Sequence, residues 1–220
     1  MDEKIKRRSG DYTWKKRILY TALVFLLGAG LGLLSKWLDT LASEQMPAFL
    51  DAIDIRNLFG RIAVWALIAV AVAVFSRSSY RAAVNVPVFF AGMLLSYWIA
   101  SIAIAGFMID ESYMLVWLIF TAISPFMGFF TWFARRRGVL AIIVGACILA
   151  YFILQAFSFD ASFSYFDLNY GGTELMMLIV CVALLYVRRP RWQTPATLGA
   201  AIVLAYLVRV AGIHIPYLLY

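Results

Sequence analysis

The sequence predicts an all-α integral membrane protein in which residues 1–220 form one compact bundle of seven transmembrane helices. Three observations lead to this fold class. Hydrophobic residues make up 64% of the chain and charged residues 14%, a composition that would expose too much apolar surface in water. Seven apolar runs are suited to crossing a bilayer. The connections between these runs also alternate in the sign of their charge.

The alternation of charge predicts how the chain lies in the membrane. Basic residues precede the first run and follow the second, fourth and sixth, whereas the other connections carry acids. Lys and Arg of short loops stay on the cytoplasmic side, so the N-terminus is expected inside and the C-terminus outside. This assignment puts 15 basic and 3 acidic residues inside, against 4 basic and 9 acidic residues outside. The basic tail, residues 1–17, is therefore cytoplasmic.

The expected spans follow from the limits of the apolar runs. A helix needs about 20 residues to cross the hydrocarbon core. By that measure the second and sixth runs are short and the third is long. In chain order the spans are residues 18–38, 62–76, 82–108, 113–133, 139–157, 173–187 and 195–215.

Two external connections carry structure of their own. In residues 40–60, Pro47 can open a helix whose apolar face holds Phe49, Leu50 and Ile53. This spacing predicts a short amphipathic helix on the outer membrane surface, which we interpret as a strut between two spans, with a lid as the alternative. Residues 158–172 are rich in Ser, Asp, Asn and aromatic residues, and are expected to form an ordered cap or turn.

Glycine and proline indicate packing features within two spans. Gly28 and Gly32 form a Gly-x-x-x-Gly pair, which permits close approach of another helix, in this chain or in a second copy. In the fourth span Ser124-Pro125 interrupts the hydrogen-bond ladder and frees the carbonyl of Thr121, which predicts a kink. That kink is either a functional hinge or an ordinary proline site whose freed carbonyl is satisfied by a nearby hydroxyl.

Polar residues within the spans gather in the outer half of the bundle. Arg209 lies inside the seventh span, and Glu174, at the start of the sixth, is its expected partner. Asp39, Asp110 and Glu111 are alternative partners on the same side. An arginine there can hold a carboxylate or phosphate, which predicts an outward-facing ligand pocket. The same residues also fit a buried ion pair that fixes helix register without a ligand. The predicted ligand-binding residues are Arg209, Glu174, Gln155, Tyr206, Ser101 and Tyr97.

Enzyme chemistry has little support in the sequence. The chain has one histidine and no metalloprotease, nucleophile-elbow or phosphate-loop motif, so no catalytic residue, metal or cofactor is expected. The excess of basic residues is expected to meet anionic lipid, and not nucleic acid. We expect a protein of the bacterial inner membrane that transports or captures a small molecule, with a small anion as a candidate ligand. The alternatives are an accessory or scaffold subunit with a partner membrane protein, and an oligomeric channel, which would need more polar spans.

Overall fold

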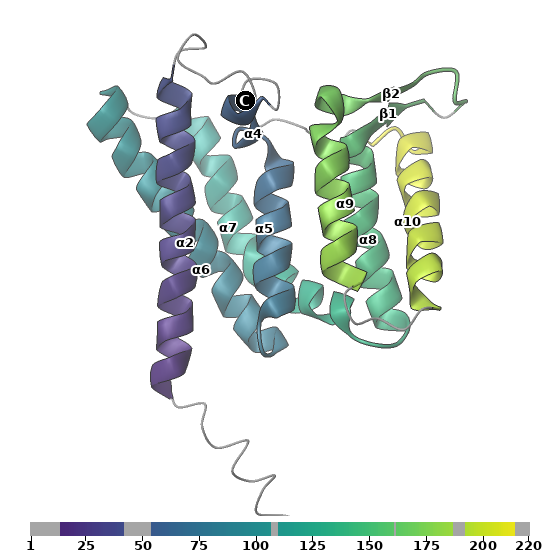
Figure 1. Cartoon of the computed structure of the whole chain (residues 1–220), viewed down its shortest axis with the longest axis horizontal. Helices are drawn as coiled ribbons and strands as arrows, with labels where there is room; N and C mark the ends of the chain where they lie inside the picture. The colour runs from purple at the N-terminus through teal and green to yellow at the C-terminus, as the bar shows by residue number, and fades with distance from the viewer. Residues whose placement is uncertain (1–13, 42–53, 107–109, 161, 187–191, 214–220) are drawn as a thin grey trace, which may run out of the picture.

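The protein forms a bundle of seven apolar helices in the residues that its computed structural model describes, which are 14–41, 54–106, 110–160, 162–186 and 192–213 (Figure 1). The all-α prediction is thus confirmed, because a helix forms from each of the seven apolar runs. The helices are α2 (Trp14–Thr40), α5 (Ile62–Phe75), α6 (Ser79–Ala100), α7 (Glu111–Thr131), α8 (Val139–Ala156), α9 (Thr173–Tyr186) and α10 (Gln193–Val210).

Several short elements extend or join these helices. A π-helical turn, Ser101–Ala105, continues α6, and a 3-10 turn, Trp132–Arg135, continues α7. A second 3-10 turn, Asn169–Gly172, leads into α9. The one-turn helix α4 (Ile55–Leu58) precedes α5.

The seven helices fall into two length classes. Five are long and apolar enough to cross a membrane: α2, α6 and α7 with their extensions, α8 and α10. In contrast, α5 and α9 have 14 residues each. At 1.5 Å per residue they span about 21 Å, less than the roughly 30 Å of a hydrocarbon core. These are the two runs that the sequence predicts to be short.

Contacts between helix ends show that α2 and α6 begin at the end of the bundle where α5 and α7 finish. The start of α6 meets the start of α2, since Arg81 donates a hydrogen bond to Thr21 Oγ1. The turn after α7 meets the end of α5, since Trp132 donates to the Ser76 carbonyl at 2.8 Å. We call the end that holds these contacts the basic end, because Arg17, Arg77, Arg81, Arg135 and Arg136 lie there.

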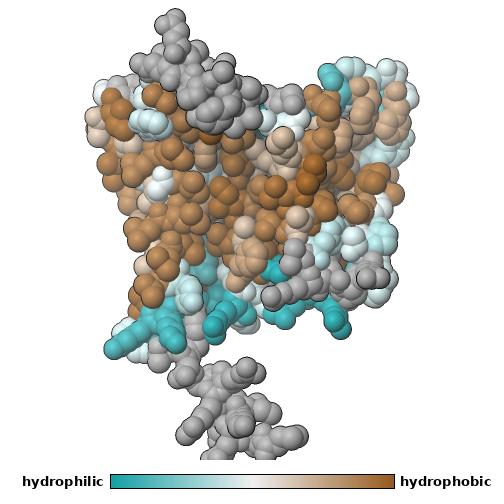
Figure 2. Space-filling view, viewed as in Figure 1, coloured by the Kyte–Doolittle hydropathy of each residue, from teal (hydrophilic) through white to brown (hydrophobic). Residues whose placement is uncertain are grey.

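The opposite end of the bundle, which we call the acidic end, carries Asp39, Asp54, Asp110, Asp160, Asp167 and Glu174. An apolar belt lies between the two ends, and hydrophilic residues gather along the edge of the molecule where α2 begins (Figure 2). The separation of charge follows the sign pattern of the connections.

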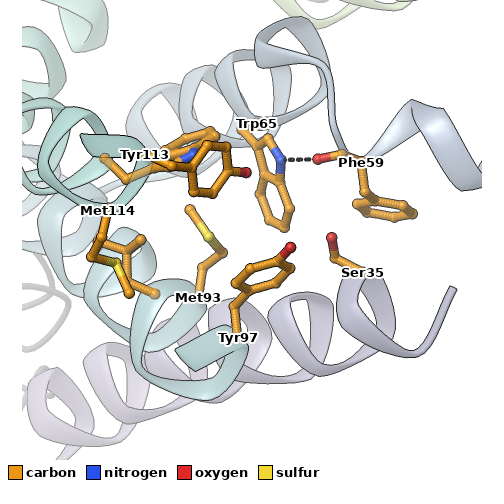
Figure 3. A pocket seen from close by; sticks show the side chains of 9 residues that line it. Ser35, Phe59, Trp65, Met93, Tyr97, Tyr113 and Met114 are labelled. Atoms are coloured by element: carbon orange, nitrogen blue, oxygen red, sulfur yellow. Dashed lines mark hydrogen bonds between the residues drawn. The ribbon is translucent and has the colours of Figure 1, made fainter. Parts of the chain in front are cut away.

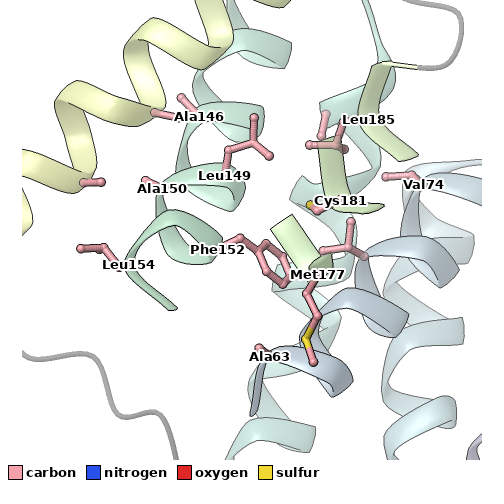
Figure 4. Close-up of a cluster of buried hydrophobic side chains, with 14 residues drawn as sticks. Ala63, Val74, Ala146, Leu149, Ala150, Phe152, Leu154, Met177, Cys181 and Leu185 are labelled. Atoms are coloured by element: carbon pink, nitrogen blue, oxygen red, sulfur yellow. The ribbon is translucent and has the colours of Figure 1, made fainter. Parts of the chain in front are cut away.

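Helix α5 lies between two apolar clusters that form the core. On one side its Ala63, Val70 and Val74 belong to a cluster that also includes residues of α8, α9 and α10, in which Leu149 and Leu185 are fully buried (Figure 4). On the other side its Trp65 and Ala73 pack against α6 and α7. The bundle therefore has two halves that share α5, with α2 placed on the outer side of α6 (Figure 1).

The predicted glycine contact exists, and it is made within this chain, against α6. A Cβ added at Gly28 would stand 2.1 Å from the Phe89 carbonyl oxygen. One added at Gly32 would stand 2.4 Å from the Met93 carbonyl oxygen. From the other helix, a Cβ at Gly92 would meet the Phe25 carbonyl oxygen at 2.4 Å. The backbones approach so closely that only glycine fits at these three positions.

The two connections that the sequence predicts to be structured differ from that prediction in one respect. Residues 158–172 contain a β-hairpin, which the sequence predicts only as a cap or turn. Strands β1 (Phe157–Phe159) and β2 (Phe166–Leu168) pair antiparallel, with Phe157 opposite Leu168. The amphipathic helix predicted from Pro47 falls in residues 42–53 and lies outside the described residues.

Candidate functional site

A buried arginine ties three segments together at the acidic end. Arg61 is the residue before α5, and its side chain is 2% exposed. One terminal nitrogen donates to Asp54 Oδ2, in the connection before α4. The other donates to Thr173 Oγ1 at 2.6 Å and to Glu174 Oε1 at 3.4 Å, both at the start of α9. The two short helices are thus joined at their first residues by charge.

Burial makes this ion pair sensitive to the loss of either partner. The Glu174 side chain is 1% exposed, so its charge is withdrawn from solvent almost completely. Removing one partner of a buried pair typically costs about 3–5 kcal/mol, because the other charge stays buried and uncompensated. In the structure Glu174 pairs with Arg61, and the prediction that it pairs with Arg209 is wrong.

Arg209 instead attaches α10 to the hairpin. The buried residues of α10 recur every fourth position at Gln193, Thr197, Ala201 and Ala205, and Arg209 continues that row. Its guanidinium donates to the Phe157 carbonyl at 3.4 Å and lies 5.5 Å from the centre of the Phe159 ring. An arginine on this row is directed at the protein and away from lipid.

Tyr206 makes a second contact between α10 and the hairpin. Its ring is stacked on Phe163, with centroids 5.7 Å apart and planes 2° from parallel. Phe163 is in turn stacked on Phe159 at 5.6 Å. The loop that carries Phe163 is closed by Asp160, which accepts hydrogen bonds from the Ser162 and Ser164 hydroxyls. These bonds, together with one from the Tyr165 amide, hold the pKa of the Asp160 carboxyl below its ordinary value.

Tyr97 belongs to a different group of residues, between α2 and α6. Its hydroxyl donates to Asp39 Oδ2 at 2.9 Å. Lys36 Nζ lies 3.9 Å from the same oxygen and 5.3 Å from the centre of the Tyr97 ring. The hydroxyl of Ser101 donates to the backbone carbonyl of Tyr97 at 2.8 Å, within its own helix. Tyr97 and Asp39 thus form a polar tie between the two helices that the glycines bring together.

A small cavity lies beside Tyr97, among α2, α5, α6 and α7 (Figure 3). Its volume is about 10 Å³, which is room for about one water molecule. The Trp65 indole N–H already donates to the Phe59 carbonyl at 2.7 Å. Aromatic and methionine side chains form most of the wall, and the lining residues are Ser35, Phe59, Trp65, Met93, Leu94, Tyr97, Tyr113, Met114 and Trp117.

The remaining predicted residues lie in ordinary structural surroundings. Ser124 Oγ donates to the Thr121 carbonyl at 2.8 Å, which is the carbonyl that Pro125 leaves without an N–H partner. Helix α7 continues through Pro125 from Glu111 to Thr131. Gln155 is 1% exposed, and its backbone carbonyl accepts a bond from the Asn169 side chain at 2.7 Å.

The predicted ligand residues thus take part in separate sets of contacts. Glu174 is with Arg61, Arg209 and Tyr206 are with the hairpin, and Tyr97 is with Asp39. The sequence prediction missed Arg61 and Lys36. A signal for both was present, because each is a basic residue in a part of the chain that otherwise carries acids.

Comparisons with known proteins found no match for this chain. No family model matches it, and neither a curated protein nor a solved structure matches. In the part of the chain that the structure describes, no group of three or more His, Cys, Asp or Glu side chains is placed to hold a metal ion.

Proposed function

We propose that this chain is a non-catalytic accessory or scaffold subunit of a membrane, with its basic end in the cytoplasm. One observation carries the proposal: polar side chains at the acidic end tie helices to one another around a cavity of about 10 Å³. Sites for small molecules enclose roughly 300–1,000 Å³. Hydrogen bonds and ion pairs between helices make the bundle rigid, as a scaffold requires. A capture site would have to break these contacts to admit a ligand.

The outer faces of the bundle suit contact with lipid or with a partner helix. Helix α7 buries only Trp117, Ser124 and Gly128, all on one narrow stripe. Its other faces carry exposed side chains, among them Phe126 at 70% and Phe130 at 53%. Such a face provides apolar surface for helix packing in a bilayer without disturbing the core.

Transport or capture of a small molecule at the acidic end is the second candidate function. Two features favour this function: the cavity has an aromatic wall, and its lining includes Tyr97, which is predicted from the sequence to bind a ligand. This function requires a conformation in which the Tyr97–Asp39 hydrogen bond opens and the cavity grows many times in volume.

Thermal unfolding in lipid nanodiscs distinguishes the two functions. A scaffold is expected to unfold at the same temperature in the presence of a panel of small carboxylates, phosphates and zwitterions. Capture requires saturable stabilisation by one of them, since a ligand at 100 times its Kd adds about 2.7 kcal/mol. That stabilisation, lost in Tyr97→Phe, would overturn the scaffold proposal.

Crosslinking in cells tests the scaffold directly. A photoreactive residue in place of Phe126 is expected to give one crosslinked species of fixed mass. The same residue in place of Phe152, which is 1% exposed, is the matched control and is expected to give none. Labelling of lipid alone at position 126 would contradict a protein partner on that face. We also propose that the protein lies in the bacterial cytoplasmic membrane, since its connections are short and alternate in the sign of their charge.

A further inference from the structure

A groove opens at the basic end, on the side of the bundle opposite to the predicted pocket. Its volume is about 360 Å³, many times that of the cavity beside Tyr97. The walls come from α2, α5, the turn after α5, and the first turns of α6. The lining residues are Tyr20, Val24, Val72, Phe75, Ser76, Arg77, Arg81 and Asn85.

The lining of the groove is divided into an apolar and a polar part. Val24, Val72 and the rings of Tyr20 and Phe75 form the apolar part, and both rings are at least half exposed. Two arginines with Ser76 and Asn85 form the polar part, and no acidic residue lies in the lining that the described part of the chain forms. A ligand that fits both parts carries negative charge at one end and hydrocarbon at the other.

In the part of the chain that the structure describes, Arg81 is held in place by hydrogen bonds from one of its terminal nitrogens. That terminal nitrogen donates to the Arg17 carbonyl at 2.9 Å, to Thr21 Oγ1 at 2.5 Å and to Asn85 Oδ1 at 3.5 Å. Asn85 is itself fixed, since its amide donates to Ser76 Oγ at 3.0 Å. Among the described residues, neither the other terminal nitrogen nor Nε has a hydrogen-bond partner, so both are oriented donors in the fork geometry that suits a phosphate.

The position of Arg81 on its helix favours an anion as well. Ser78 is the N-cap of α6 and accepts a bond from the Arg81 backbone N–H. Arg81 thus lies in the first turn, where the helix dipole adds positive potential. Negative charge in the groove is thus favoured by the fixed Arg81 guanidinium, by Arg77 and by the start of α6.

We propose that this groove binds one anionic phospholipid of the leaflet at the basic end. Its phosphate lies at Arg81 and Arg77, and one acyl chain lies along Val24, Val72 and Phe75. A lipid suits the site better than a soluble phosphate does, because the apolar wall continues into exposed rings that meet the hydrocarbon region. The site does not depend on the scaffold proposal, since a transporter could hold such a lipid equally well.

Native mass spectrometry of the full chain in detergent tests the site. Phosphatidylglycerol and phosphatidylcholine with identical acyl chains are titrated separately. We expect one phosphatidylglycerol to bind preferentially, and Arg81→Gln to weaken it roughly five- to tenfold while phosphatidylcholine is unaffected. Arg136→Gln is the matched control, because Arg136 is a basic-end arginine that stacks on Trp132 at 3.7 Å and does not line the groove.

A second variant covers the case in which Arg81→Gln disturbs the fold. Val72→Phe fills the apolar part and leaves the arginine network intact, and it is expected to lower phosphatidylglycerol binding as well. Equal binding of phosphatidylglycerol by the wild type and both groove variants would overturn the proposal. Displacement of the lipid by millimolar glycerol phosphate, with no dependence on Val72→Phe, would identify a soluble anion as the ligand and would also overturn it.

Discussion

Replacement of Gly28 by alanine tests the closest contact in the bundle. The new methyl group would stand 2.1 Å from the Phe89 carbonyl oxygen, 3.0 Å from the carbonyl carbon and 3.1 Å from the Met93 nitrogen. All three atoms belong to the backbone, so no side-chain rotation relieves the clash. Because ordinary contact begins at 3.4 Å, α2 would have to retreat from α6 by about 1.3 Å. Overpacking of this kind costs about 1–3 kcal/mol.

Gly30 provides the matched control in the same helix. A Cβ there has no heavy atom within 4 Å, so Gly30→Ala adds the same methyl group without a clash. Both variants gain the same helix propensity, up to about 1 kcal/mol, and the difference between them isolates the steric cost. For a chain of this size that difference corresponds to roughly 2–12 °C in unfolding temperature.

Thiol labelling during heating measures this difference. Cys181 is buried in the core, so a thiol-reactive dye reports unfolding once Cys147, which is exposed, has been replaced by serine. Gly28→Ala is expected to unfold at the lower temperature. Equal unfolding temperatures for the two alanine variants would refute the packing of α2 on α6 through these glycines.

Three further predictions concern single polar contacts. Arg61→Gln and Glu174→Gln should each lower the free energy of unfolding by about 3–5 kcal/mol. In a double-mutant cycle measured by unfolding in detergent, the double variant should lose less than the sum of the two. Additive losses would mean that the two side chains do not interact. The Asp160 carboxylate should protect the Tyr165 amide from hydrogen exchange above about pH 4, the ordinary pKa. That protection should disappear as the pH falls through the lowered pKa of the folded state, and be weak at every pH in Asp160→Asn; a wild type that loses it near pH 6 would contradict the contacts of Asp160. Ser124→Ala should cost about 1–3 kcal/mol next to Pro125, and the cost should vanish in a Pro125→Ala background; an equal cost in both backgrounds would show that the serine serves another partner.

The positions of the helices followed from local features of the chain. Length of an apolar run and sign of the flanking charge act within a segment, so they predict a span without knowledge of its neighbours. The two 14-residue helices α5 and α9 were recognisable as short for the same reason. The contact at Gly28 was also predictable, because two glycines four residues apart leave a shallow face, but its partner helix was not.

The pairing of Arg61 with Glu174 required the tertiary structure. Sequence distance gives no reason to join residues that lie 113 positions apart, and Arg209 was nearer to the acid in the chain. The better indication of the pairing was the presence of basic residues on the side of the membrane that otherwise carries acids. Of the four basic residues assigned to the acidic side, Lys36, Arg61 and Arg209 each have a charged or carbonyl partner in the structure. The fourth, Arg56, has a side chain outside the described part.

The hairpin escaped prediction because its strands are too short to show a pattern. Three residues such as Phe157–Phe159 cannot display the alternation of period two that marks a strand. Its order comes from contacts across the bundle, chiefly Tyr206 on Phe163 and Arg209 on Phe157. Such contacts are determined only once α8 and α10 lie side by side.

The proposed orientation, with the basic end in the cytoplasm, underlies both the scaffold and the lipid site. Its most direct test is labelling of single cysteines by a membrane-impermeant maleimide in sealed cells, with Cys147 and Cys181 replaced by serine. Positions 136 and 167 are suitable, because both side chains are exposed and lie at opposite ends of the bundle. We expect a cysteine at 167 to react in intact cells and one at 136 to react only after permeabilisation. Reaction of both positions from the same side of the membrane would contradict this orientation.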